Sequence, residues 1–155
     1  GGQERGLRAG TESVHHIVGL GEAFSHAYSN LDADKSQITD VKMYCINQLK
    51  STFSDMSFNG CCDDLTKSTY TIVNARIPMS PEKANLLGFT LDLKGICCSK
   101  GSACQAGSET GSHVLNHILS KKQLQSPSIR ISFSKYNTKK DVDQLVDVLN
   151  NYISA

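Results

Sequence analysis

The stretch Ser128-Ile129-Arg130-Ile131-Ser132-Phe133-Ser134 decides the fold. Polar and apolar side chains alternate at all seven positions, which predicts a β-strand with one buried face and one polar face. Thr138 and Asp141 then form a predicted capping box at the start of a helix over about 138–153. The apolar residues of that helix recur at helical spacing and are Val142, Leu145, Val146 and Leu149. A sheet with at least one covering helix is therefore expected.

The same two patterns, strand alternation and helical spacing, predict the other elements of the chain. β-branched and aromatic residues favour strands at 68–78 and 96–98. Apolar residues at helical spacing, with turn residues at the ends, predict helices at about 13–30, 34–52, 80–95 and 114–119. Three strands with helices laid against them give an α/β fold, an α+β layer sandwich built on one small sheet.

Composition excludes several classes of protein. The 155 residues hold 16 Lys and Arg against 15 Asp and Glu, a balance that argues against nucleic-acid coating and against a disordered polyelectrolyte. The longest apolar run is five residues, Ile17–Gly21, too short for a membrane span or a signal peptide. Six cysteines, four of them in adjacent pairs, do not suggest a disulfide framework, so a reducing cytoplasmic setting is expected.

Cys104 is the first candidate for chemistry. It lies between Gly101 and Gly107 in a run of small and polar residues, where a thiol would be reachable, and Lys100 is a potential cationic neighbour. A cysteine is more often a packing residue, and that interpretation holds for Cys45 and Cys97, which sit in apolar patterns. The flanks of Cys104 are not those of a core position.

Arg130 and the segment 5–12 are two further candidates, and both have the chemistry of an anion-binding site. Arg130 stands on the polar face of a strand, where a solvated side chain is the ordinary explanation and a fixed guanidinium fork for a carboxylate is the alternative. The glycine-rich segment 5–12 can bring backbone N–H groups close to an anion, and Thr11 adds a hydroxyl donor there, although a loop with a helix cap would look the same. A thiol-based metal or redox site is weaker, because the cysteine gaps do not match zinc spacing.

Together these segments resemble a known family. Gly-Gly-Gln-Glu-Arg-Gly-Leu-Arg-Ala-Gly-Thr-Glu (1–12), Ser-Lys-Gly-Ser-Ala-Cys (99–104) and Ser-Ile-Arg-Ile-Ser-Phe-Ser (128–134) are similar, in the same order, to three motifs of NifS/IscS-type cysteine desulfurases. These are class V enzymes that depend on pyridoxal 5'-phosphate and share the aspartate aminotransferase fold. Lys100 departs from the family's second serine, and no segment resembles the motif that carries the cofactor lysine.

The resemblance implies a role for each candidate. Cys104 would attack the sulfur of cofactor-bound L-cysteine, take it up as a persulfide and leave L-alanine. Arg130 would bind the substrate carboxylate. Thr11 would donate to the cofactor phosphate, across the interface of a homodimer. A sulfur-acceptor or iron–sulfur scaffold protein would then receive the sulfur, for cluster or thio-cofactor assembly.

The resemblance also implies a domain plan. Residues 1–30 would be the tail of a large cofactor domain with its linking helix, and 31–155 a small C-terminal domain with a mainly antiparallel sheet. The chain has no initial Met and no cofactor lysine motif, so we expect a piece of a longer enzyme that is inactive alone. Selenocysteine lyase, another class V enzyme, a metal or redox module and a domain that merely dimerises are the alternatives.

Overall fold

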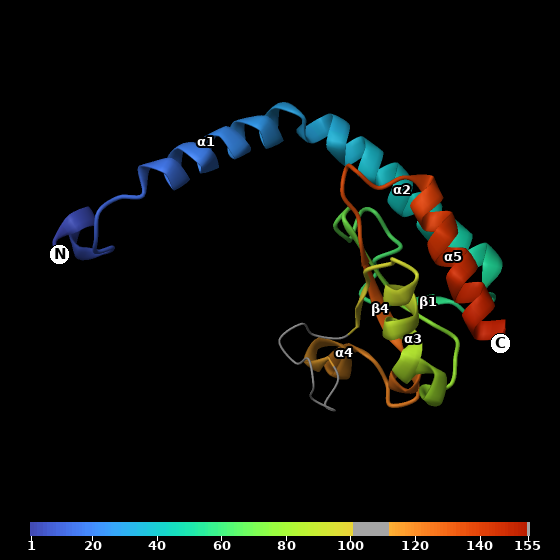
Figure 1. Ribbon diagram of the computed structural model, residues 1–155. Helices are drawn as coiled ribbons and strands as arrows, with labels where there is room; N and C mark the ends of the chain where they lie inside the picture. Colours follow the sequence, from blue (N-terminus) through green and yellow to red (C-terminus); the bar gives the residue numbers. More distant parts are fainter. Residues whose placement is uncertain (101–111, 155) are drawn as a thin grey trace. The chain divides into compact units, whose positions relative to one another are not determined.

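The computed structural model describes residues 1–100 and 112–154, in two compact units, 1–34 and 35–155 (Figure 1). The first unit holds a short 3-10 helix, η1 (Gln3–Gly6), and the helix α1 (Val14–Ser29). The predicted helix at 13–30 is thus confirmed. Its apolar side chains stay exposed, with Leu20 at 69% and Phe24 at 58%. The helix presents an apolar face that no residue of its own unit covers.

The second unit is built on a four-stranded antiparallel sheet. Its strands are β1 (Ser57–Phe58), β2 (Ile72–Arg76), β3 (Ser99–Lys100) and β4 (Ser128–Ser132), in the order β1-β2-β4-β3. The expectation of three strands was wrong, because β1 has only two residues and shows no period of its own. The strand expected at 96–98 is absent from those residues, and β3 begins directly after them, because pairing to β4 begins where Ser99 meets Arg130.

Helices cover the apolar face of this sheet. They are α2 (Leu31–Thr52), whose residues from 35 onward belong to this unit, α3 (Pro81–Leu93) and α5 (Lys139–Ser154). Figure 1 shows α2 beside α5, and the hydroxyl of Tyr44 donates to Asp143 Oδ1 at 2.7 Å between them. The elements α4 (His113–Ile118) and η3 (Gln123–Gln125) lie between β3 and β4 in sequence. The α/β class is confirmed.

The core forms where the alternating strands meet the helix stripes. The predicted stripe residues of α2 and α5 are buried, as are the inward residues of the two central strands, and the least exposed are Cys45, Leu49, Val73, Ala75, Ile129 and Leu149. Lys42 is buried among them with no exposed surface. Its ammonium donates to Ser68 Oγ at 2.8 Å and to the Thr69 carbonyl at 2.7 Å. Burial lowers the pKa of Lys42 from its ordinary value.

The ends of the helices follow their sequence signals. Ser80 caps α3 by accepting from the Lys83 N–H at 3.5 Å, as predicted. Gly95, at φ +73°, closes α3, and the N–H groups of Gly95 and Ile96 donate to the carbonyls of Asp92 and Leu91. This is the Schellman arrangement, which requires a left-handed residue. At α5, the Asp141 carboxylate accepts from the Thr138 N–H at 2.8 Å, which is one of the two bonds of the predicted box, whereas the Asp141 N–H donates to the Thr138 carbonyl.

Within the described residues, the helices all fall short of the combined length and apolar character that crossing a membrane demands.

Candidate functional site

The polar face of the sheet carries Arg130. In the paired strands β2 and β4 the buried residues alternate with half-buried ones, so Arg130 and its register partner Asn74 point away from the helices. Ser99 of β3 is the other register partner of Arg130. Directly paired residues share one face of a sheet. Arg130 is therefore mounted at the centre of the face, between a strand on each side.

A second arginine and two amides form a hydrogen-bonded network on this face. Asn59 follows β1 and is only 4% exposed, and both polar atoms of its side chain form hydrogen bonds. Its Nδ2 donates to Asn74 Oδ1 at 3.0 Å and to Ser128 Oγ at 2.9 Å. Its Oδ1 accepts from Arg76 Nη1 at 3.1 Å. Asn59 thus holds two same-face neighbours of Arg130, Asn74 across the ladder and Ser128 along β4.

The same loop also holds the backbone of Asn74. Gly60 and Cys61, at φ +67° and +56°, reverse the chain so that Cys62 returns toward β2. The Asn74 N–H donates to Cys62 Sγ at 3.2 Å, and the thiol donates to the Asn74 carbonyl at 3.4 Å. The Asn59 N–H donates to that carbonyl as well, at 2.9 Å. Asn74 is consequently fixed at both its main chain and its side chain.

The three predicted site residues fall in different places. Arg130 lies on the polar face as predicted. Thr11 is an exposed residue of the first unit, in the segment before α1, and its carbonyl accepts from Arg8 Nη1 at 3.1 Å. Cys104 lies outside the described residues. Thr11 and Arg130 therefore belong to different units of the chain.

Sequence reasoning missed Asn59, Asn74 and Arg76. Asn74 and Arg76 were visible in principle, because Ile72-Val73-Asn74-Ala75-Arg76 alternates in the manner of the Arg130 strand. Asn59 carried only a turn signal, and its reach across to β4 depends on a tertiary contact between residues 69 positions apart.

The described cysteines differ in their availability. Burial raises the pKa of Cys45 to about 12 and that of Cys98 to about 11, so neither forms a thiolate at neutral pH. Cys61 and Cys97 are exposed. Residues 1–100 and 112–154 contain no group of three His, Cys, Asp or Glu side chains arranged to hold a metal ion.

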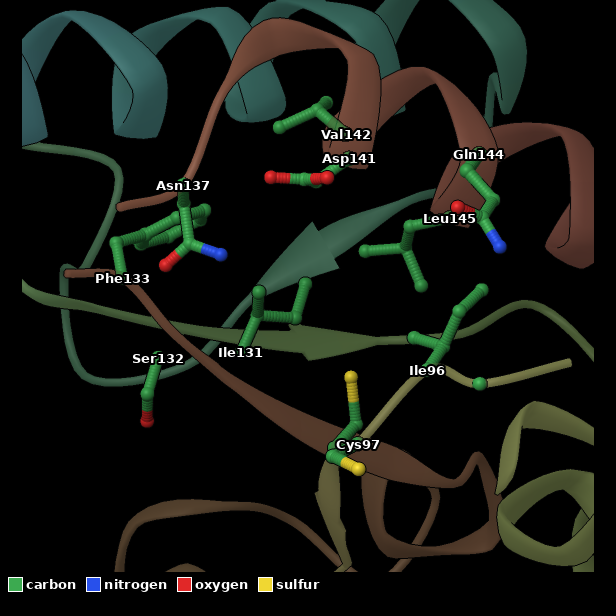
Figure 2. A pocket seen from close by; sticks show the side chains of 12 residues that line it. Ile96, Cys97, Ile131, Ser132, Phe133, Asn137, Asp141, Val142, Gln144 and Leu145 are labelled. Atoms are coloured by element: carbon green, nitrogen blue, oxygen red, sulfur yellow. The ribbon is translucent and has the colours of Figure 1, made fainter. Parts of the chain in front are cut away.

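A cavity of about 330 Å³ lies between β4, the segment leading to β3 and the start of α5. Figure 2 shows Ile131 of β4 and Leu145 of α5 among the side chains that line it. Two of its polar residues are already engaged: Asp141 caps α5, and Asn137 Oδ1 accepts from the Ser134 N–H at 2.8 Å. Cys97 and Cys98 also border it. The cavity offers thiols and apolar walls.

Comparison with known proteins identifies the family. The sequence model of the aminotransferase class-V family matches residues 2–145, so the chain belongs to this family. Curated relatives named cysteine desulfurase IscS align over 153 residues, 99% of this chain, and include proteins from Dictyoglomus turgidum (33% identical), Pseudoalteromonas translucida (32%) and Clostridium botulinum (34%). The chain spans only 36–38% of the length of these relatives.

Solved structures agree on the fold. A NifS-like protein from Rickettsia africae superposes with a TM-score of 0.77 at 24% identity, over 100% of this chain and 39% of that one. A second NifS-like protein gives 0.75 at 26% identity, over 99% and 37%. The arrangement of helices and sheet is thus that of the corresponding part of these proteins.

Proposed function

We propose that the chain is the C-terminal part of a pyridoxal 5'-phosphate-dependent cysteine desulfurase, which converts L-cysteine to L-alanine and a persulfide on Cys104. The observation that carries this proposal is the alignment of nearly the whole chain with proteins named cysteine desulfurase IscS. The family match over residues 2–145 supports it. The described chain alone is expected to be inactive, since the motif with the cofactor lysine is not in its sequence.

Arg130 is proposed to bind the substrate carboxylate. Its strand is central in the sheet, so the side chain has a rigid mount. The residue is half-buried, and within the described residues no carboxylate pairs with its guanidinium. A guanidinium offers two parallel N–H donors to a carboxylate, which fixes both the position and the orientation of the ligand.

The residues present fit the cofactor at one position. The Thr11 side chain is exposed, and its hydroxyl has no hydrogen bond to another described residue, so it is available to donate to the cofactor phosphate, as proposed across the interface of a homodimer. When bound, pyridoxal 5'-phosphate supplies the electron sink for the bond changes in the substrate. The residues of this chain supply the phosphate donor, the carboxylate clamp and the sulfur nucleophile.

Cys104 is proposed as that nucleophile. Its thiolate attacks the sulfur of bound cysteine, a sulfur–sulfur bond forms and the carbon–sulfur bond breaks, which leaves a persulfide on the protein and, after proton uptake, alanine. The small residues Gly101, Ser102 and Ala103 precede it. A sulfur-acceptor or iron–sulfur scaffold protein would take the persulfide sulfur, and we place the enzyme in the cytoplasm.

The test uses the complete enzyme that contains this chain, loaded with pyridoxal 5'-phosphate. Incubation with L-cysteine should release alanine and add one sulfur, 32 Da, to the peptide with Cys104, as measured by mass spectrometry. Cys104→Ser should lose the persulfide and reduce alanine release to background, because a hydroxyl is a far weaker nucleophile toward sulfur than a thiolate.

Cys97→Ser is the matched control, since Cys97 is an exposed thiol seven positions away, and it should retain the persulfide on Cys104. Unchanged alanine release in Cys104→Ser would contradict the proposed nucleophile. A kcat/KM for L-selenocysteine far above that for L-cysteine would instead assign a selenocysteine lyase.

A further inference from the structure

The hydrogen bonds of Asn59 fix the orientation of two amides, its own and that of Asn74. An arginine side chain only donates, so the atom of Asn59 that faces Arg76 Nη1 is the oxygen. The nitrogen of Asn59 must then face Asn74 and Ser128. Since this nitrogen donates, Asn74 must present its Oδ1 to it. The Nδ2 of Asn74 is left on the other side of its amide.

This arrangement leaves two donors without acceptors at one place. Within the described residues, neither the Nδ2 of Asn74 nor the guanidinium of Arg130 has a hydrogen-bond partner, although both side chains are half-buried. The two residues are directly paired in the ladder, where Cβ atoms are about 4.5–5.5 Å apart. Half-buried donors are normally satisfied. Two of them side by side can share one acceptor that is supplied by solvent or by a bound ligand.

The chemistry of the face selects an anion as that acceptor. The side chains around the pair include Asn59, Arg76, Ser99, Ser128 and Ser132, which bring a second positive charge and no carboxylate. No described acidic residue forms an ion pair with Arg76 or Arg130. A planar carboxylate can accept two bonds from the guanidinium fork and still offer a lone pair to an adjacent amide.

We propose that Asn74 is a substrate-binding residue, whose Nδ2 donates to the same substrate carboxylate as Arg130, and that Asn59 is its positioning residue. This inference rests on the proposed function, because it takes the carboxylate to be that of the amino-acid substrate. The ligand class is an α-amino acid with a free carboxylate. Asn59 acts through Asn74, by holding the amide with its donors outward.

The first test is Asn74→Ala in the complete enzyme loaded with pyridoxal 5'-phosphate. KM for L-cysteine should rise about tenfold, the factor of one hydrogen bond to a charged group, with kcat within about twofold of the wild type. The KM effect without a kcat effect is expected because the carboxylate is bound equally in the ground state and the transition state. Asn151→Ala, the same change at an exposed position of α5, should leave both constants unchanged.

A binding measurement separates a carboxylate contact from a loss of activity. By isothermal titration calorimetry of the same loaded enzyme, Asn74→Ala should weaken L-alanine about tenfold and leave ethylamine, which is alanine without its carboxylate, unchanged. Asn74→Asp covers the case in which alanine disturbs the strand. It keeps an oxygen for Asn59 but replaces the donor with a negative charge beside Arg130, so it should weaken L-alanine more than Asn74→Ala does.

A double-mutant cycle tests the positioning role. Asn59→Asp can still accept from Arg76 but cannot donate to Asn74, which frees the Asn74 amide to turn. Asn59→Asp should raise KM in the wild-type background and add little to Asn74→Ala. A purely structural role would give additive effects on KM.

The outcomes distinguish this inference from the proposed function. Arg130→Ala should raise KM for L-cysteine and weaken L-alanine. If it does so while Asn74→Ala and Asn74→Asp match the wild type in both measurements, the role of Asn74 is overturned and the proposed function stands. If Arg130→Ala also matches the wild type, the carboxylate site on this face is overturned as well.

Discussion

Lys42 is a charged residue that the fold holds without any exposed surface. Its two hydrogen bonds go to neutral oxygens of Ser68 and Thr69, so no carboxylate offsets the loss of water around the ammonium by direct contact. Burial is the largest cause of its lowered pKa. The ammonium therefore costs more free energy in the folded chain than in the unfolded one, and neutral lysine removes that cost.

This imbalance predicts a pH dependence of stability. Between the lowered pKa of Lys42 and its ordinary value of 10.5, the unfolded chain binds more protons at this position, so the contribution of Lys42 to the free energy of unfolding rises with pH. Lys42→Met should lack that rise. Urea unfolding of the 155-residue chain at a series of pH values up to about 10.5 measures it, and the exposed Lys121→Met is the control. Parallel pH profiles for wild type and Lys42→Met would contradict the prediction.

Of the candidate site residues on the sheet, the sequence predicted Arg130 but not Asn74 or Asn59. Alternation alone placed Arg130 on a polar strand face, because a strand with one buried face has a fixed period of two. It did not indicate Asn74, although the β2 pattern is of the same kind, because the register that sets Asn74 opposite Arg130 depends on how two strands pair. Asn59 had no usable signal, since its partners lie on two other strands, β2 and β4.

Among the elements, α3 offers two glycines with opposite requirements. Gly95 closes the helix at φ +73°, where a Cβ atom is disfavoured, so Gly95→Ala should lower the free energy of unfolding by about 1–2 kcal/mol. Gly88 lies within α3, and a Cβ atom there would meet nothing within 4 Å. Gly88→Ala should therefore raise the free energy of unfolding by about 0.5–1 kcal/mol. Urea midpoints of the two variants of the chain should shift in opposite directions, and shifts in the same direction would contradict this reading of the cap.

Element prediction succeeded where the period repeated and failed where it did not. Among the described residues, the α-helices and the two central strands were predicted because each runs long enough to show a period or a clear start and stop signal. β1 and β3 have two residues each and exist through pairing with β2 and β4. A two-residue strand carries no alternation, so β1 was missed and the strand at β3 was expected just before its actual position.

For the molecule as a whole, the two units differ in how much apolar surface they bury. Leu49 of α2 has no exposed surface, whereas Leu20 of α1 is 69% exposed. In the 155-residue chain, Leu49→Ala should lower the free energy of unfolding by about 2–5 kcal/mol, because it leaves a cavity in the core. Leu20→Ala should change it by less than about 0.5 kcal/mol. Equal losses in urea unfolding would show that α1 is buried as deeply as α2.

The sequence predicted the apolar stripe of α1 but not its exposure. A helical period tells which side chains share a face, and it is silent on what surface meets that face. The comparisons supply the context for this, since the chain spans 36–38% of the length of its curated relatives.

The short loop after β1 has a consequence for how this family member tolerates change in length. Two residues of this loop bind Asn74: the Asn59 amide donates to its side chain, and the Cys62 thiol accepts from its backbone N–H. A single residue inserted between Asn59 and Cys62 would move the two apart and break one of these hydrogen bonds. Loops usually tolerate insertions. Here, natural or engineered lengthening should disturb the surroundings of the Arg130 guanidinium on β4, to which residues 59–62 make no hydrogen bond.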